Sequence, residues 1–350
     1  MKVGLIGFAR SGKTTIFNAL TGATAEVGAY GNRDANVAVI KVPDARIDVL
    51  AEIFEPKKKT FAEIEFIDIA PVEGSEKALD NAALNLLKNT DALVHVVRNF
   101  KNDNVLHPRE KVDPKRDVLS LEEELQLIDL IIIEKRLERL EKEHKKDLEY
   151  ELLSRCKDQL ESGAPLRSLE LNAHEEGSLR NFTFLSQKPM MILVNNGEEA
   201  IGEEDPSGLG ELADSLKLQA MDLCGALEME VSGLSEEEQA AFREELGLGE
   251  ASRTRFIQFV YDLLGLVSFL TAGKPEVRAW TIRKGTPAVD AAGVIHSDIK
   301  RGFIRAETVA YTHFIEAGSM AKAKEKGWVR LEGKEYVVQD GDMLLFRFNV

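Results

Sequence analysis

The stretch "GLIGFARSGKTTIFNAL", from Gly4 to Leu20, constrains the fold more than any other part of the sequence. Gly7, Gly12, Lys13 and Thr14 have the spacing G-x-x-x-x-G-K-[ST], directly after a short apolar segment and directly before a helical pattern. Glycines at these positions let backbone N–H groups approach phosphate oxygens, the lysine neutralises β and γ oxygens, and the threonine hydroxyl can bind Mg²⁺. The motif therefore predicts a phosphate-binding loop between a strand and a helix.

Four apolar segments alternate with helical patterns along the chain. They cover residues 2–6, 62–69, 92–97 and 189–194. Alternation of this kind predicts a parallel sheet with helices packed against it, which is an α/β fold.

Polar residues stand at or directly after the ends of two of these segments. Asp68 ends a buried strand, where a carboxylate can contact Mg²⁺ directly or indirectly, and the alternative is a helix N-cap. Asn195 and Glu198 follow 189–194, where a loop that recognises the base belongs. A carboxylate there could accept hydrogen bonds from the N–H donors of guanine. A carboxylate on a longer or displaced side chain would leave those donors without a partner, at a cost of about 1–3 kcal/mol. The choice of base therefore depends on Glu198.

Composition narrows the class of protein. A chain of 350 residues predicts two or three domains, and no run of about 18 apolar residues or secretory leader is visible. Cys156 and Cys224 are too far apart, and lack the neighbours, for a disulfide framework or a structural zinc site. We therefore expect a soluble protein of the reducing cytoplasm, with no membrane contact.

Charge is distributed unevenly. The net charge is −15, which argues against binding nucleic acid over the whole surface. From Lys274 onward, however, 13 basic residues stand against 10 acidic ones, a net charge of +3. The C-terminal segment is thus the part expected to meet an anionic partner. Its run "HSDIKRGFIR" allows RNA contact, and the alternative is packing within the protein.

Two segments outside the expected sheet have their own character. Residues 118–159 have apolar positions at spacings of three and four, which predicts amphipathic helix, in the form of a coiled-coil hairpin. The charged face of this segment indicates either a solvated surface or a contact with the ribosome or another partner. From Thr271 onward, short β-rich runs with Gly and Asp turns predict a small separate domain.

Several longer stretches resemble the YchF/Obg-like ATPase family, which belongs to the Obg-related P-loop GTPases. The resemblance covers nearly the whole chain. It rests on residues 42–58, 91–107, 112–114, 271–286, 293–311 and 336–350, of which the last three stretches are highly specific.

The resemblance implies an architecture. Residues 1–108 and 186–272 would form a P-loop nucleotide-binding G domain, and 109–185 a helical coiled-coil insertion. Residues 273–350 would form a C-terminal TGS domain, which has a ubiquitin-like β-grasp fold.

The resemblance also implies a nucleotide and its contacts. In this family the base motif is N-x-x-E, which matches Asn195 to Glu198 and implies ATP, with GTP as the alternative. The register one residue later, Asn196 to Glu199, also fits. The full set expected to bind nucleotide is Gly7, Arg10, Ser11, Gly12, Lys13, Thr14, Thr15, Asn195 and Glu198, with Thr14 and Asp68 on Mg²⁺.

Catalysis in such a protein would involve other residues. Val72 stands where Ras-like proteins have a catalytic glutamine, and the family assigns the positioning of water to a histidine that matches His107. Arg10 replaces an asparagine that helps to hold a potassium ion, so its guanidinium could supply that charge. The alternative is an arginine that faces solvent or pairs with an acid.

The switch regions depart from the family pattern. The motif D-x-x-G becomes Asp68 to Pro71, and proline has no N–H to offer a γ-phosphate. The preceding loop lacks the family's threonine, and Asn32 is nearest to its place. Two functions follow: a slow ATPase that acts as a switch on ribosomes or another partner, or a non-hydrolysing nucleotide-binding module that works as an interaction and RNA-binding scaffold. The sequence leaves the oligomeric state open.

Overall fold

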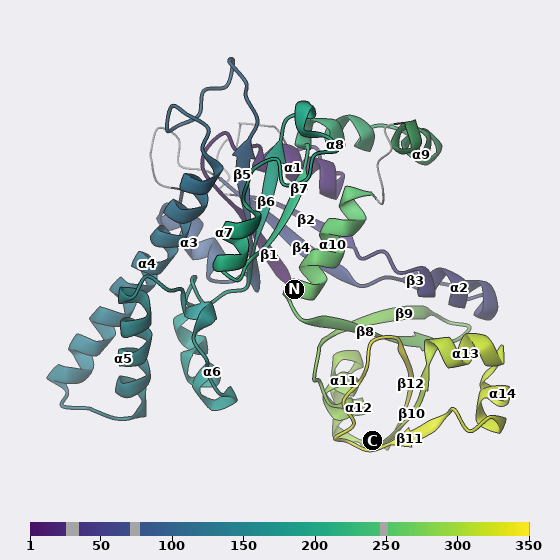
Figure 1. The fold of residues 1–350 in the computed structure, drawn as a ribbon. Coiled ribbons are helices and arrows are strands. Elements are labelled where there is room, and N and C mark those ends of the chain that lie inside the picture. Colours follow the sequence, from purple (N-terminus) through teal and green to yellow (C-terminus); the bar gives the residue numbers. More distant parts are fainter. Residues whose placement is uncertain (26–34, 71–77, 246–250, 350) are drawn as a thin grey trace. The chain divides into compact units, whose positions relative to one another are not determined.

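The computed structural model describes residues 1–25, 35–70, 78–245 and 251–349, and the chain divides into two compact units (Figure 1). The first unit comprises Met1–Val39 and Glu65–Phe256, and the second comprises Ile40–Ile64 and Ile257–Val350. The expectations for Asn32, Pro71 and Val72 concern positions outside the described residues, so they stay predictions.

The first unit is built on a sheet with the strand order β2-β4-β1-β5-β6-β7, in which β4, β1, β5, β6 and β7 pair in parallel. The strands are β1 (Lys2–Ile6), β2 (Ala35–Lys41), β4 (Glu63–Ile69), β5 (Ala92–Asn99), β6 (Met190–Asn196) and β7 (Gln219–Leu223). Every residue of β6 is buried, and so is β5 up to its last residue, as expected for central parallel strands covered on both faces. The predicted parallel α/β sheet is confirmed.

Strand register brings the predicted polar residues to one edge of this sheet. Leu5 of β1 pairs with Asp68 of β4, and Arg98 of β5 pairs with Asn195 of β6. The carboxyl ends of four neighbouring strands therefore meet where the loop that follows β1 leads into α1 (Lys13–Thr21). Ligands bind at this edge in open α/β sheets.

The helices of the first unit pack against the sheet and extend from it. They are α1, α3 (Asn81–Leu87), α4 (Pro114–Lys142), α5 (Leu148–Glu161), α6 (Ala173–Leu179), α7 (Gly210–Ser215), α8 (Gly225–Ser232) and α9 (Glu236–Glu245), and α10 (Ser252–Leu263) runs on into the second unit. Single 3₁₀ turns cover Leu166–Ser168, Arg180–Phe182 and Glu198–Ala200.

Helix α4 belongs to two hydrophobic cores. It begins after Asp113, whose side chain accepts a hydrogen bond from the backbone of Arg116, and Pro114 occupies its first turn. Its first half buries Val118, Leu121 and Leu125 in the core beside the sheet. Its second half packs against α5 through a separate core that includes Ile133, Leu137, Leu140, Leu153 and Cys156. Helices α4 and α5 form the predicted hairpin, which we call the helical arm.

Two buried carboxylates fix the base of the helical arm. Asp129 accepts hydrogen bonds from the backbone N–H groups of Leu185 and Ser186, at 2.9 and 2.7 Å. Glu122 pairs with Arg167 at 2.8 Å. Because buried carboxylates are costly unless they are bonded, these contacts hold the arm and the chain before β6 in one arrangement.

The second unit contains a mixed sheet with the order β11-β10-β12-β8-β9-β3. Its strands are β3 (Lys59–Thr60), β8 (Leu266–Ala272), β9 (Val277–Arg283), β10 (Phe303–Ala310), β11 (Arg330–Glu332) and β12 (Asp342–Phe348). Its helices are α2 (Ala45–Phe54), α11 (Ala288–Ile295), α12 (Ser297–Arg301), α13 (Tyr311–Ala317) and α14 (Met320–Glu325). Helix α11 packs its alanines against Phe269, Phe303 and Phe346, the helix-on-sheet arrangement of a β-grasp fold.

The domain boundaries expected at residues 108, 185 and 272 stay predictions. The compact units are divided at other places, because residues 40–64 pack within the second unit and β8 begins at Leu266 in its sheet. Within the described residues, no helix combines the length and apolar character needed to cross a membrane.

Candidate functional site

A cavity of about 900 Å³ opens at the carboxyl edge of the parallel sheet. Its lining comes from the loop before α1 and α1 itself, the segment after β5, the end of β6 and the start of α8. These residues are Arg10, Gly12–Thr15, Phe100–Asn102, Val105, Asn195–Glu199, Cys224 and Ala226. All the residues predicted to bind nucleotide line this cavity except Gly7 and Ser11, which lie in the same loop.

The loop before α1 has a backbone that requires glycine at two positions. Gly7 has φ +145°, and a Cβ there would lie 2.4 Å from the carbonyl oxygen of Val96. Gly12 has φ +87°, and a Cβ there would lie 2.2 Å from Nδ2 of Asn195. Side chains at these positions would force the loop away from its neighbours. The two glycines of the motif thus set the loop conformation, as predicted from their spacing.

Lys13, the first residue of α1, is buried against this loop. Its Nζ donates to the carbonyl oxygens of Gly7 at 2.8 Å and Phe8 at 3.0 Å, and only 4% of the residue is exposed. The hydroxyl of Ser11 is also buried, and it has no hydrogen-bond partner in the described part of the chain. A buried hydroxyl without a partner is rare, and a phosphate oxygen held by the loop would satisfy it.

Thr14 and Asp68 meet beside the loop. The Oγ1 of Thr14 donates to Oδ2 of Asp68 at 2.9 Å, and Nδ2 of Asn36 donates to the same oxygen at 3.1 Å. Asp68 is fully buried within β4, and the helix that follows is capped by Asp80, so the N-cap alternative for Asp68 is excluded. A hydroxyl beside a carboxylate is the kind of oxygen donor set that suits Mg²⁺.

Asn195 joins β6 to two other parts of the site. Its Nδ2 donates to the carbonyl oxygen of Ser11 at 3.0 Å, and its Oδ1 accepts from the backbone N–H of Gly225 at 2.9 Å. Asn196 has different partners, because it donates to Asp222 at 2.8 Å and accepts from Asn99 at 2.7 Å. Of the two asparagines, Asn195 is therefore the one that bonds to the phosphate loop.

Glu198 and Glu199 follow in a single 3₁₀ turn, and both line the cavity. A Cβ on Gly197 would lie 2.2 Å from Oε2 of Glu199, so the carboxylate of Glu199 is folded over the backbone of Gly197. Glu198 is exposed in the cavity wall. Glu199 is exposed as well, so the fourth position of the base motif stays a prediction.

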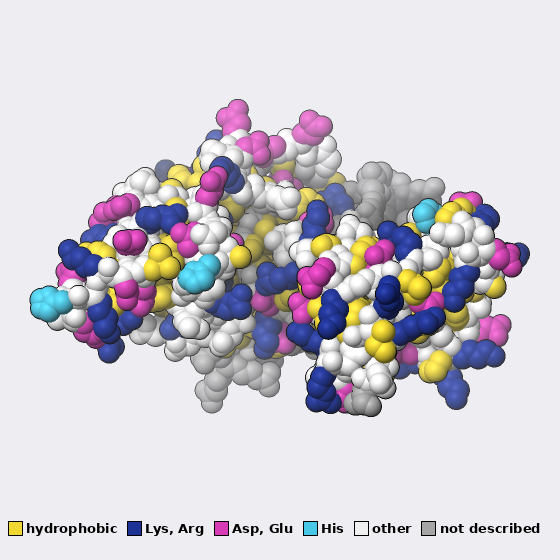
Figure 2. Space-filling view, turned by 90° about the horizontal axis from the view of Figure 1, so that it is seen from below, with side chains coloured by type: hydrophobic (Ala, Val, Ile, Leu, Met, Phe, Trp, Pro, Cys, Tyr) yellow, Lys and Arg dark blue, Asp and Glu magenta, His cyan; other side chains and the backbone are white. Residues whose placement is uncertain are grey.

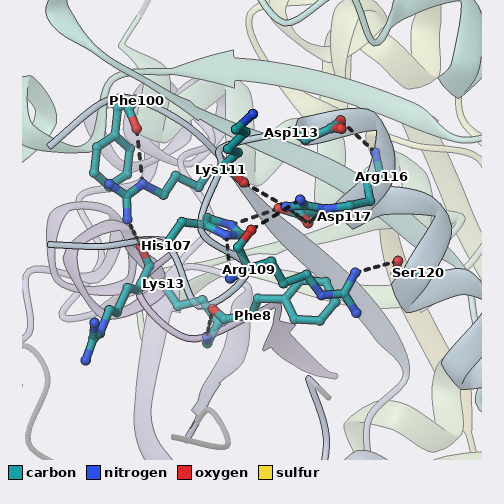
Figure 3. Close-up of polar contacts among 12 residues, drawn as sticks. Phe8, Lys13, Phe100, His107, Arg109, Lys111, Asp113, Arg116, Asp117 and Ser120 are labelled. Carbon is teal, nitrogen blue, oxygen red and sulfur yellow. Dashed lines mark hydrogen bonds and ion pairs between the residues drawn. The ribbon is translucent and has the colours of Figure 1, made fainter. Parts of the chain in front are cut away.

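His107 is not among the described residues that line the cavity. Its Nε2 lies 3.0 Å from Oδ2 of Asp117, and its Nδ1 accepts from the backbone N–H of Arg109 at 3.1 Å (Figure 3). Burial lowers the pKa of His107, and the positive charges of Arg116 and Arg98 act in the same direction, while Asp117 opposes them. These contacts fit a neutral imidazole that donates from Nε2 and is held away from the cavity in this structure.

Arg10 does line the cavity, as expected. It has φ 63°, an uncommon conformation for a residue other than glycine, and Nη1 donates to the carbonyl oxygen of Leu106 at 3.2 Å. Nη1 of Arg98 reaches the carbonyl oxygen of Arg10 at 3.4 Å. The side chain of Arg10 is thereby turned toward the segment that follows β5.

Three residues in and directly after β5 were not singled out from the sequence. His95, in the centre of β5, is completely buried, and neither of its ring nitrogens has a partner among the described residues. Burial, with the charge of Lys13 nearby, lowers the pKa of His95 to about 3. The guanidinium of Arg98 lies 4.3 Å from the ring centroid of Phe100, which lines the cavity. The only sequence signal for these three residues is a charged residue, Arg98, at the end of a buried strand.

Comparison with known proteins gives matches over the whole chain. A family model described as a 50S ribosome-binding GTPase matches residues 2–136, and the model YchF-GTPase_C, described as a protein of unknown function, matches residues 266–349. The curated "Ribosome-binding ATPase YchF" of Bacillus subtilis is 43% identical and covers 100% of both chains. The protein of that name from Escherichia coli O157:H7 is 41% identical, covering 100% of this chain and 99% of its own.

A solved structure matches as well. The YchF GTPase of Schizosaccharomyces pombe superposes with a TM-score of 0.85 at 28% identity, covering 99% of this chain and 97% of its own.

Proposed function

The chain belongs to the YchF family, and from this membership and the geometry of the cavity we propose that it is a ribosome-binding nucleoside triphosphatase that hydrolyses ATP with Mg²⁺. One observation carries the proposal. The hydroxyl of Thr14 and the carboxylate of Asp68 lie 2.9 Å apart, next to the buried Lys13 and to a loop whose backbone conformation requires glycine. This arrangement fits a triphosphate and its metal ion.

The residues present fit both groups. Backbone N–H groups of the loop, the Ser11 hydroxyl and the Lys13 ammonium would receive phosphate oxygens, with Lys13 exchanging its carbonyl partners for them. Thr14 and Asp68 would hold Mg²⁺, which when bound supplies positive charge beside the phosphates.

Base choice is assigned to Asn195 and Glu198. Asn195 is supported as the first residue of the base motif because it bonds to the phosphate loop, whereas Asn196 bonds to Asp222. Glu198 then occupies the fourth position of N-x-x-E and is exposed in the cavity wall. We expect ATP to bind at least as well as GTP.

Two residues are proposed to assist the chemistry. Arg10 would place its guanidinium near the phosphates by leaving the carbonyl oxygen of Leu106. His107 would have to leave Asp117 before it could position a water molecule. If Arg10→Asn hydrolyses ATP at the rate of the wild type and without potassium, the role of Arg10 is wrong.

The alternative function, a non-hydrolysing module, is not favoured. Its basis is Pro71 and the altered loop around Asn32, and both lie outside the described residues. The curated relatives that match the whole chain are named ATPases.

The binding surface for the ribosome is a separate proposal. Within the second unit, Lys300 pairs with Asp290 at 2.7 Å and Arg301 pairs with Asp298 at 2.6 Å, so the basic run is partly neutralised by its own neighbours. Figure 2 shows basic, acidic and hydrophobic side chains interspersed on the face in view.

We propose that the basic run around Lys300 and Arg301 contributes to RNA contact. A salt-dependent affinity for ribosomal RNA that is lost in Lys300→Glu with Arg301→Glu would support it, and a flat salt response would exclude it. Ribosome binding supports a cytoplasmic location.

A competition titration tests the nucleotide proposal. A fluorescent ATP analogue is displaced by unlabelled ATP or GTP, in the presence of Mg²⁺, from the wild type, Glu198→Ala and the matched control Glu199→Ala. We expect the wild type to bind ATP at least as tightly as GTP, and only Glu198→Ala to change the ratio of the two affinities. A changed ratio in Glu199→Ala alone would show that the later register is the correct one.

A further inference from the structure

Phe8, in the middle of the phosphate loop, is contacted by a residue from outside the cavity. Its ring is buried, and the guanidinium carbon of Arg109 lies 4.4 Å from the ring centroid. The carbonyl oxygen of Phe8 accepts a hydrogen bond from Lys13 at 3.0 Å. A shift of the Phe8 ring would therefore move an acceptor of the lysine that is proposed to receive phosphate oxygens.

Arg109 is held in turn by the first turns of α4, as Figure 3 shows. Its Nη1 donates to Oγ of Ser120 at 2.7 Å, and its backbone N–H donates to Nδ1 of His107 at 3.1 Å. Both of these partners connect to α4, because Ser120 is part of that helix and His107 is paired with Asp117.

The His107–Asp117 pair is the buried centre of this connection. The two side chains are only 2% and 3% exposed, and their nitrogen and oxygen lie 3.0 Å apart. Arg116 fixes the other oxygen of Asp117 at 2.9 Å and also donates to the carbonyl oxygen of Lys111 at 2.9 Å. The segment between β5 and α4 is thus fastened to α4 on one side and touches the phosphate loop on the other.

Helix α4 can carry a displacement from the helical arm to these residues. It is one unbroken helix of 29 residues, packed beside the sheet at its start and against α5 at its end. A helix packed along its length shifts as a unit, because its backbone hydrogen bonds and side-chain contacts resist local change. Movement of the arm would therefore move Ser120 and Asp117.

We propose that Arg109 is a positioning residue for the phosphate loop, and that α4 couples the helical arm to nucleotide binding through Arg109 and the His107–Asp117 pair. The inference rests on the proposed function, since it requires a nucleotide in the cavity. The described lining of that cavity includes neither Arg109 nor its α4 partners Ser120 and Asp117. Because coupling is reciprocal, a partner that displaces the arm changes nucleotide affinity by the same factor by which nucleotide changes the affinity for that partner.

Nucleotide affinity in a set of variants tests this inference. The set is Arg109→Ala, Arg109→Lys, Ser120→Ala and the double variant Arg109→Ala with Ser120→Ala. The control is Arg278→Ala, which breaks a cation–π contact with Trp280, 3.7 Å from the ring centroid, in the second unit. Each is titrated with a fluorescent ATP analogue and Mg²⁺, well below its melting temperature, so that a loss of stability alone does not change the Kd.

We expect the Kd of Arg109→Ala to rise by about three- to tenfold, the range for a lost cation–π contact. Ser120→Ala should raise the Kd in the same direction, the double variant should be no weaker than Arg109→Ala, and Arg109→Lys should recover part of the affinity by keeping a cation over Phe8. The Kd of Arg278→Ala should equal that of the wild type.

A wild-type Kd in both Ser120→Ala and Arg109→Ala would overturn the inference while leaving the proposed function intact, and so would strictly additive effects in the double variant. Ser120→Ala removes a single oxygen atom, so it keeps the test decisive if Arg109→Ala does not fold. Failure of the wild type itself to bind the analogue would instead count against the proposed function.

Discussion

The Oγ1 hydroxyl of Thr14 donates to Oδ2 of Asp68 at 2.9 Å, which joins the first turn of α1 to the end of β4. This contact places the two proposed Mg²⁺ ligands side by side. Preorganised oxygen ligands lose less conformational freedom on binding.

The first prediction concerns the carboxylate of that pair. Asp68→Asn keeps the size of the side chain but removes its charge, so the concentration of Mg²⁺ needed for half-maximal ATP hydrolysis should rise by about tenfold or more. A Mg²⁺ titration of phosphate release measures this. Asp80→Asn, at the N-cap of α3, is the control, because asparagine caps helices as well as aspartate does and the Mg²⁺ dependence should not change. Equal titration curves for wild type and Asp68→Asn would contradict the metal assignment.

The second prediction distinguishes two neighbouring amides. Asn195→Ala leaves the carbonyl oxygen of Ser11 and the N–H of Gly225 without their partner, so nucleotide affinity should fall by about tenfold. Asn196→Ala should have a clearly smaller effect, because its partners Asp222 and Asn99 lie outside the phosphate loop. Isothermal titration with ATP and Mg²⁺ measures both, and a larger loss for Asn196→Ala would reverse the assignment.

The third prediction concerns stability and the buried imidazole of His95. His95→Leu removes two ring nitrogens that have no partner in the described residues, so the free energy of unfolding at neutral pH should rise by about 1–3 kcal/mol. Chemical denaturation measures this. An unchanged or lower stability would show that the imidazole makes a contact that the leucine cannot replace.

The same residue predicts a pH dependence. The pKa of His95 is lowered from 6.5 to about 3 in the folded protein, so the unfolded chain binds a proton below pH 6.5 that the folded chain does not. This residue therefore causes no loss in the free energy of unfolding above pH 6.5. As the pH falls from 6.5 toward 3, the free energy of unfolding decreases with a slope of up to about 1.4 kcal/mol per pH unit. Denaturation of wild type and His95→Leu between about pH 7 and 5, within that window, should diverge as the pH falls. Parallel curves would contradict the lowered pKa.

The fifth prediction uses the two cysteines as probes of the cavity. Cys224 lines the cavity with 8% of the residue exposed, and burial raises its pKa. Cys156 is completely buried in the helical arm, where burial raises its pKa to about 11. ATP with Mg²⁺ should slow the alkylation of Cys224 and leave that of Cys156 unchanged and slow. Mass spectrometry after timed iodoacetamide treatment gives both rates. Equal rates at Cys224 with and without ATP would place the nucleotide elsewhere.

Local patterns in the sequence were sufficient to predict the phosphate loop. Gly7, Gly12, Lys13 and Thr14 lie close together in the sequence, so their spacing alone indicates the loop and its chemistry. Asp68 and Asn195 were predictable because the ends of parallel strands converge at one edge of a sheet.

Contacts between distant or irregular segments could not be predicted in this way. The pairing of His107 with Asp117, and the position of Arg109 over Phe8, depend on the path of a loop that has no periodic pattern. Residues 40–64 join the second unit through α2, whose Ile47 and Leu50 lie in its core, and through β3, which is only two residues long. In the sequence His95 resembles any other residue of a buried strand, and its lack of partners among the described residues is visible only in three dimensions.

Phosphate release from ATP in the presence of Mg²⁺, compared between wild type and Lys13→Ala, tests the central claim most directly. The proposed function predicts slow hydrolysis by the wild type that is clearly above background and is lost in Lys13→Ala, whose cavity lacks the ammonium at the phosphate loop. Release at background level by the wild type, or at the wild-type rate by Lys13→Ala, would contradict it.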